Sequence, residues 1–184
     1  MRIFLGLGII GMVFVAGCAG GVHNHSGNSS ANTSTPAAMS SFTTTDRAWI
    51  EITTAMDEQL VPMLDLVDSH TGTAAARDLG RKADASTKSE LLDLRRLHDQ
   101  AGLPAENPHK GMEMPGMVSS SQIAHAGALR EADFDGYLKK CLRDHLEQKE
   151  RLALGEKSSG KEPQTVSLAS RVLQEQGRLS ALVE

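Results

Sequence analysis

The chain of 184 residues carries a formal net charge of −4 at neutral pH, with 19 basic and 23 acidic residues, and only 3% of its residues are aromatic. Basic and acidic residues are interleaved, and neither a basic patch nor an aromatic stacking platform is present. This composition argues against nucleic-acid binding, so we expect no nucleic-acid partner.

The N-terminus has the layout of a bacterial lipoprotein signal. Arg2 supplies a positive charge, the run from Ile3 to Val15 is uncharged, and two small residues precede Cys18. The run is too short and too interrupted by glycine for a membrane span of about 20 residues, although a transmembrane helix is the alternative. The pattern resembles the lipobox, so we expect residues 1–17 to be a signal peptide that is removed and Cys18 to be lipidated.

Lipidation would place the protein in the bacterial envelope. Several acyl chains hold a protein stably on a membrane, whereas one chain does not. We therefore expect an anchor on the outer side of the cytoplasmic membrane or on the periplasmic side of the outer membrane. Because the lipid consumes Cys18, Cys141 has no partner for a disulfide within the chain.

Residues 18–45 are expected to form the lipidated end and a disordered tether. After Cys18 the segment is mostly Gly, Ser, Thr, Asn and Ala, with no apolar periodicity. A flexible coil of this length spans about 30 Å, which is enough to hold a domain clear of the headgroups. His23 and His25 could chelate Cu(II) or Zn(II) weakly, but this spacing in a polar tail is more often incidental.

Residues 46–184 are expected to form one all-α domain. Asp46 is expected to cap a first helix, which Pro62 should kink, and a second helix should follow Gly72 and end near Gly102. Apolar residues recur in steps of three and four along both helices. The two stripes are Trp49, Ile52, Met56, Leu60, Met63 and Val67, and then Ala76, Leu79, Ala83, Leu91, Leu94 and Leu97.

The second half of the domain begins with a loop over residues 103–119 that is rich in Pro, Gly and Met. Ser120 or Ser121 should open a short helical turn after it. Asp133 is expected to cap the next long helix, which the segment 155–163 should close.

A last helix is expected from about Gln164 to Leu182. The stripes of the two helices are Phe134, Leu138, Cys141, His145, Gln148 and Leu152, and then Val166, Ala169, Leu173, Gln176, Leu179 and Val183.

The two helical hairpins resemble a repeat. A shift of 85 residues aligns Trp49 with Phe134, and it aligns Met56 with Cys141. Two hairpins that pack face to face make a four-helix bundle, which is the architecture that we expect.

Two segments resemble the second half of the domain-of-unknown-function 305 family. They are Gly111-Met112-Glu113-Met114-Pro115-Gly116-Met117-Val118 and Phe134-Asp135-x-x-Leu138-x-x-Cys141-Leu142-x-x-His145. In the first half, Glu90-Leu91 resembles the Glu-Ile before the family's loop, and Met56 matches the methionine before its first histidine pair. The resemblance implies a ferritin-like four-helix bundle in the bacterial envelope, with copper binding in some relatives.

The chain departs from the family at the histidines. The family usually has Met-x-x-His-His on the first helix of each hairpin, whereas this chain has Met56-x-x-Gln59-Leu60 and Cys141-x-x-Asp144-His145. One histidine of four remains. A degenerate member that serves structure or partner binding is therefore an alternative to a metal protein.

Two groups of residues are candidate metal ligands. Cys141 and His145 lie one helical turn apart, and a thiolate with an imidazole suits Cu(I) or Zn(II). Alternatively, they are a small core hydrophobe and a core histidine.

The loop is the second candidate, with His109, Met112, Met114 and Met117. Three thioethers within six residues match the preference of Cu(I), and Pro115 with Gly116 could turn the chain so that the flanking methionines converge. Alternatively, the methionines are apolar filler at the open end of the bundle.

We expect no enzyme activity. A di-iron bundle needs Glu-x-x-His pairs on helices, and the pair of Glu106 and His109 contains Pro108 and lies in the loop. The sequence therefore predicts a lipid-anchored envelope protein that binds or buffers a soft metal ion, copper first. The alternative is a metal-free structural or interaction lipoprotein with a degenerate metal site, and no motif indicates its protein partner.

Overall fold

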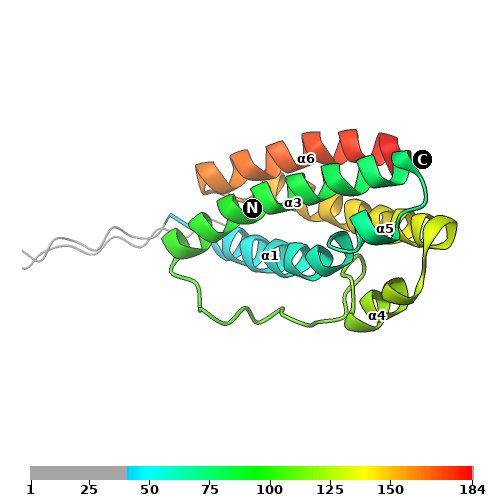
Figure 1. Ribbon diagram of the computed structural model, residues 1–184. Coiled ribbons are helices and arrows are strands. Elements are labelled where there is room, and N and C mark those ends of the chain that lie inside the picture. Colours follow the sequence, from blue (N-terminus) through cyan, green and yellow to red (C-terminus); the bar gives the residue numbers. More distant parts are fainter. Residues whose placement is uncertain (1–40, 184) are drawn as a thin grey trace, which may run out of the picture. The chain divides into compact units, whose positions relative to one another are not determined.

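The computed structural model describes residues 41–183. The expected signal peptide, Cys18 and most of the expected tether lie outside the described residues. The secondary structure within them is helical, and none of these helices combines the length and the apolar character that a membrane span requires. The helices (Figure 1) are α1 (Thr44–Leu64), α2 (Val67–His70), α3 (Ala74–Ala101), α4 (Ser120–Ala128), α5 (Glu131–Ser159) and α6 (Pro163–Val183).

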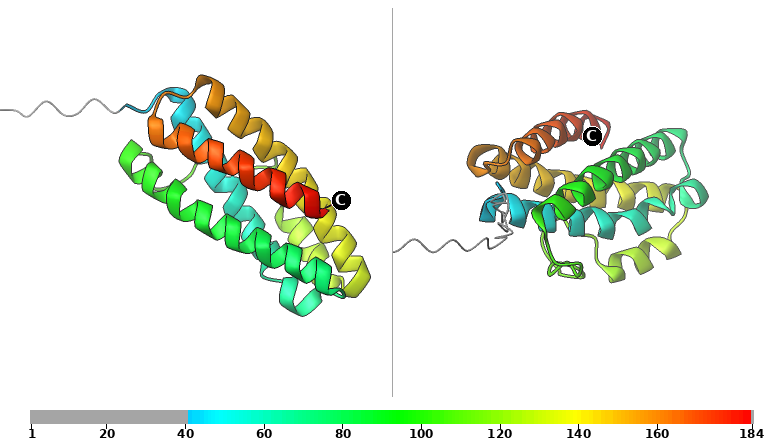
Figure 2. Two further views of the ribbon diagram at one scale, coloured as in Figure 1. Left: turned by 90° about the horizontal axis from the view of Figure 1, so that it is seen from above. Right: turned by 90° about the vertical axis from the view of Figure 1, so that its left-hand side faces the viewer.

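Four of these helices form the predicted bundle. The first hairpin is made of α1 and α3, and the second is made of α5 and α6. The hairpins also pack against each other, α1 on α5 and α3 on α6, so the four helices form a closed ring (Figure 2). The short helix α4 lies outside the ring, where it contacts α1 and α5. The all-α fold class and the bundle are therefore confirmed.

Two predicted helix caps are wrong by a few residues. Thr43 caps α1, and Asp46 is its partner in a capping box, because the Asp46 carboxylate accepts from the Thr43 backbone N–H. Helix α5 begins at Glu131 with Arg130 as its N-cap, so Asp133 lies in the first turn and does not cap. Acidic residues are favoured both as caps and in the first turn, and the sequence does not separate the two.

The ends of α3 and α5 agree with the prediction, whereas α1 ends before the end of its predicted stripe. Helix α1 includes Pro62 and ends two residues later, at Leu64. Val67 of the predicted first stripe therefore lies in α2, where it is still buried. Helix α5 continues through Gly155 as far as Ser159. Helix α3 ends as predicted at Gly102, which adopts the left-handed conformation with φ of 61°.

Each hairpin stabilises the start of a helix in the other hairpin through an aspartate. Asp135 of α5 accepts from the backbone N–H groups of residues 72 and 73 and from the Thr73 hydroxyl, at 2.7–3.1 Å, just before α3. Asp46 of α1 accepts from the N–H groups of residues 161 and 162, at 2.9 and 3.1 Å, just before α6. Helix N-termini leave such N–H groups without intrahelical partners, so the two aspartates fix how the hairpins dock.

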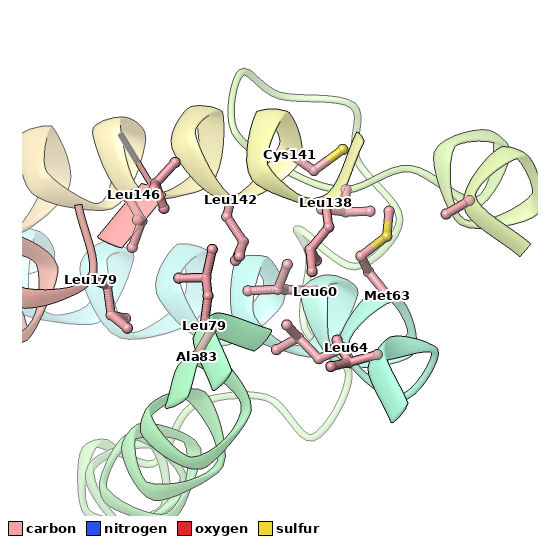
Figure 3. Close-up of a cluster of buried hydrophobic side chains, with 14 of the residues drawn as sticks. Leu60, Met63, Leu64, Leu79, Ala83, Leu138, Cys141, Leu142, Leu146 and Leu179 are labelled. Atoms are coloured by element: carbon pink, nitrogen blue, oxygen red, sulfur yellow. The ribbon is translucent and has the colours of Figure 1, made fainter. Parts of the chain in front are cut away.

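The apolar core is divided into two main clusters along the bundle. One lies toward α2 and α4 (Figure 3), and the other lies toward the start of α1. The first includes Leu60, Met63, Leu64, Leu79, Leu138, Leu142 and Leu179, and the second includes Trp49, Ile50, Leu94, Leu97, Leu168 and Val172. The helix segments between the two clusters carry several buried polar side chains, among them Thr53, Asp57, Thr87, Glu90 and Lys149.

Candidate functional site

An ionic layer crosses the middle of the bundle. We use this name for Asp57 of α1, Glu90 of α3, and His145 and Lys149 of α5, which are all buried. Charged side chains are almost never fully buried unless they are paired, so this layer needs internal partners.

Lys149 holds the layer together. Its Nζ atom lies 2.7 Å from Asp57 Oδ1 and 2.7 Å from Glu90 Oε2, so one ammonium group bridges carboxylates from two different helices. In bundle-core metal sites, inward carboxylates from facing helices hold a cation. Here the ammonium group of Lys149 occupies the place between two such carboxylates.

Within the ionic layer the pKa of Asp57 is lowered, whereas the pKa of Glu90 is raised. Burial is the largest single influence and would raise the pKa of Asp57, but the charge and hydrogen bond of Lys149 together with those of His145 outweigh burial and lower it. Burial, together with the negative charge of Asp57, raises the pKa of Glu90 to about 7 in spite of Lys149. Burial opposes the charged form of Lys149, but the two carboxylates raise its pKa.

His145 connects the ionic layer to the methionine-rich loop. Its Nδ1 atom lies 3.1 Å from the carbonyl oxygen of Gly116, and because that oxygen can only accept, Nδ1 carries the proton. Its Nε2 atom lies 3.5 Å from Asp57 Oδ1. Burial, with the nearby charge of Lys149, lowers the pKa of His145 although Asp57 opposes the change. The imidazole therefore holds the loop against α5 in its neutral form.

The loop itself makes a tight turn over residues 114–117. The Met117 N–H donates to the Met114 carbonyl at 3.0 Å, with Pro115 and Gly116 in the central positions, and Gly116 has a φ of 80°. A Cβ atom on Gly116 would lie 2.4 Å from Gln148 Cβ and 2.8 Å from the Asp144 carbonyl, so the turn lies directly on α5. The predicted turn brings both flanking methionines to the bundle surface.

These two methionines pack on a third one from α1. Met117 and Met56 are buried in one small apolar cluster, and Met114 packs against it. We call Met56, Met114 and Met117 the thioether cluster. Met112, in contrast, is 44% exposed and is not part of the cluster. The structure thus brings together two of the three predicted loop methionines and adds Met56.

Gln59 fastens the loop over this cluster. With its amide oriented so that both ends are satisfied, it donates to the Val118 carbonyl at 3.2 Å and accepts from the Gly111 N–H at 3.1 Å. The opposite orientation offers only a contact of 3.7 Å from the amide nitrogen to Met117 Sδ. In the family pattern given above, this position is a histidine. In this chain, Gln59 instead hydrogen-bonds the backbone of the loop.

Cys141 and His109 are not members of the thioether cluster. Cys141 packs in the leucine cluster around Leu138, where Figure 3 shows its side chain leaving α5 in a different direction from Leu142. Burial raises the pKa of its thiol, so the reactive thiolate is disfavoured. His109 is half-buried, and its backbone N–H donates to the Asn107 side chain at 2.9 Å. No group of three or more His, Cys, Asp and Glu suited to a metal ion occurs in residues 41–183.

Sequence reasoning missed two members of the ionic layer. Asp57 directly follows Met56, on the edge of the predicted stripe, and Lys149 follows His145 by four residues. The spacing Cys141, His145, Lys149 was a usable signal, because residues four apart share a helix face.

The comparisons with known proteins agree with this fold. The model of the family described as domain of unknown function (DUF305) matches residues 46–182. A crystal structure of a DUF305 protein from Streptomyces coelicolor, described as a candidate secreted protein, is similar with a TM-score of 0.68 and 18% identity, covering 76% of this chain and 88% of that chain. A DUF305 fragment from Deinococcus radiodurans has a TM-score of 0.68 and 14% identity, covering 77% of this chain and 94% of that chain. No curated protein matches the chain.

Proposed function

The chain belongs to the DUF305 family, and from that premise we propose that it is a lipid-anchored protein of the bacterial envelope that binds a soft metal ion, copper first, at the thioether cluster. The observation that carries this proposal is the turn over residues 114–117, which packs Met114 and Met117 on Met56. Thioethers suit Cu(I) and are poor ligands for Mg²⁺ or Ca²⁺.

The local structure supports this choice of site. The loop is held to the bundle from two sides, by His145 on Gly116 and by Gln59 on the backbone of the loop. A site whose ligands are held in place loses less entropy when an ion binds. Thioethers also need no deprotonation, so such a site would keep Cu(I) in acidic surroundings, where imidazole and thiolate ligands become protonated.

The envelope location rests on the N-terminal signal pattern. The run up to Cys18 has the charge, length and small residues of a lipoprotein signal. The DUF305 protein from Streptomyces coelicolor is described as a candidate secreted protein, which is compatible with export of this chain. Lipidation of Cys18 would then hold the domain at a membrane surface.

A metal-free role in structure or protein interaction is the second candidate, and the ionic layer favours it. The ammonium group of Lys149 lies between Asp57 and Glu90, so these two carboxylates already have a cation. If the thioether cluster does not bind copper either, the domain is a degenerate member whose loop only packs on the bundle.

Competition for Cu(I) separates the two candidates. The purified full chain is titrated against a chromogenic Cu(I) chelator, alongside the double variant Met114→Leu/Met117→Leu, which keeps the volume of the side chains. The matched control is Met112→Leu, in the same loop but outside the cluster, and a Cys141→Ser variant tests the bundle thiol.

The proposal requires that the wild type and Met112→Leu remove copper from the chelator equally and that the double variant does not. Loss of copper only in Cys141→Ser would move the site into the bundle. No copper uptake by the wild type at stoichiometric concentrations would reject the metal proposal in favour of the metal-free role.

A further inference from the structure

A groove of about 660 Å³ lies along the bundle between α3 and α6. The volume is in the range of small-molecule binding sites. On the α3 side the groove is lined by the small residues Ala85, Ser86 and Ser89, and on the α6 side it is lined by Leu168, Val172 and Leu179. Short side chains facing long apolar ones leave room for a ligand with an apolar body.

Glu90 lines the same groove. Its Oε2 atom accepts from Lys149, but its Oε1 atom is buried and has no hydrogen-bond partner among the described residues. The side chain is only 8% exposed and Oε1 is shielded from solvent, so a ligand reaches this oxygen only when the carboxylate turns toward the groove. A buried carboxylate oxygen without a donor is costly, so a ligand that supplies an N–H donor there would be favoured.

The cations that line the groove are already neutralised by carboxylates. The pairs are Lys82 with Asp78 at 2.7 Å, Arg171 with Asp93 at 2.8 Å and Arg178 with Glu175 at 3.0 Å. An anionic ligand would therefore have to displace an existing ion pair. A cationic ligand finds an acceptor in Glu90 that no donor uses.

We infer that the groove between α3 and α6 binds a small organic cation, an amine whose ammonium group is held by Glu90 while its apolar body packs on Leu168, Val172 and Leu179. The hydroxyl groups of Ser86 and Ser89 are additional acceptors on the same wall. The site is separate from the thioether cluster, which lies at α1 and the loop, so it does not depend on the proposed copper binding.

Three small aromatic probes of nearly equal shape test this inference. The purified full chain is titrated by calorimetry with 2-phenylethylamine, with neutral 2-phenylethanol and with anionic phenylacetate at about pH 8, above the pKa of Glu90 of about 7, so that its carboxyl group is mostly ionised. We expect saturable binding of the amine with a Kd below about 1 mM, which is reasonable for a ligand of this size. We expect binding of the other two probes to be at least tenfold weaker.

Two variants locate the binding. Ala85→Phe fills the groove from an exposed position of α3 and should weaken amine binding at least tenfold, whereas Ala124→Phe, at an exposed position of α4, should not change it. Glu90→Gln should abolish the preference for the amine over the alcohol. If Glu90→Gln does not fold, the loss of amine binding in Ala85→Phe still tests whether the ligand binds in the groove. Equal binding of all three probes, preference for phenylacetate, no saturation below about 10 mM, or an unchanged Ala85→Phe variant would each overturn the inference.

Discussion

Replacing Lys149 with methionine should destabilise the protein by about 3–5 kcal/mol at neutral pH. The change removes an ammonium group that lies 2.7 Å from both Asp57 and Glu90, while the methionine keeps most of the apolar stem of the side chain. Two buried carboxyl groups then remain without a cation. Most of the cost comes from this uncompensated charge, because the change of volume is small.

The cost should depend on pH in a defined direction. In the wild type, Lys149 keeps the pKa of Asp57 lowered against the effect of burial, and it restrains the pKa of Glu90. Without it, both carboxyl groups should titrate at higher pH in the folded protein than in the unfolded chain. Their protonation then relieves the strain, so the difference in unfolding free energy between wild type and variant should shrink as the pH falls from about 8 to 5.

Urea unfolding followed by circular dichroism measures this difference. The matched control is Lys140→Met on the same helix, which removes a surface ion pair with Asp144 whose side chains are 62% and 46% exposed. Surface pairs contribute about 0–1 kcal/mol, so the control should lose little stability. If Lys149→Met costs no more than Lys140→Met, the account of the ionic layer is wrong.

Three further predictions concern the other end of the bundle, the loop and the anchor. Burial, with the nearby carboxylate of Asp46, raises the pKa of Glu156 from 4.5 to about 8. Protonated Glu156 therefore stabilises the folded protein fully below pH 4.5, and this stabilisation is lost as the pH rises to about 8. Glu156→Gln should remove that loss, which is at most about 5 kcal/mol, and urea unfolding should find the variant more stable than the wild type at pH 9 but not at pH 5. Gly116→Ala should lower the thermal midpoint by several degrees more than Gly111→Ala. Both glycines have a positive φ, but only Gly116 is crowded by α5. Equal losses in the two variants would mean that backbone strain alone, and not contact with α5, causes the destabilisation. Cys18→Ala should abolish labelling by a fatty-acid analogue, and unchanged label would favour a transmembrane helix instead.

The apolar pattern predicted both hairpins because each bundle helix buries a continuous stripe. Gly102 marked the end of α3 correctly, whereas α5 continues through Gly155 and ends within the predicted closing segment. The family resemblance drawn from the Met-Pro-Gly-Met loop and the Phe134-Asp135 helix start is confirmed by the match over residues 46–182. Asp135 also has a physical reason, because it accepts from the backbone N–H groups of residues 72 and 73, just before α3.

The ionic layer was not predicted, because its pairing is not local. A helix in a ring contacts two neighbours, so its buried face is wider than one stripe, and Asp57 lies on the part that a single stripe leaves out. Lys149 and Asp57 are 92 positions apart in the sequence, and a lysine is normally exposed. Only the packing of α1 against α5 shows that the two side chains meet.

The thioether cluster was predicted in part for a similar reason. The turn residues Pro115 and Gly116 predicted that Met114 and Met117 converge, and the structure packs both on one surface. Met56 was predicted as part of the first apolar stripe and noted in the family resemblance, but not as a neighbour of the loop, since that contact depends on how the loop crosses α1. The loop sequence alone gave no reason to separate Met112 from the other two methionines.

Copper K-edge X-ray absorption of the Cu(I)-loaded full chain tests the central claim most directly. The thioether cluster predicts one bound ion with a ligand shell of sulfur atoms, and the spectrum should be the same for Met112→Leu. The shell should be lost in Met114→Leu/Met117→Leu. A shell dominated by nitrogen or oxygen, or the same sulfur shell in the double variant, would contradict copper binding by Met56, Met114 and Met117.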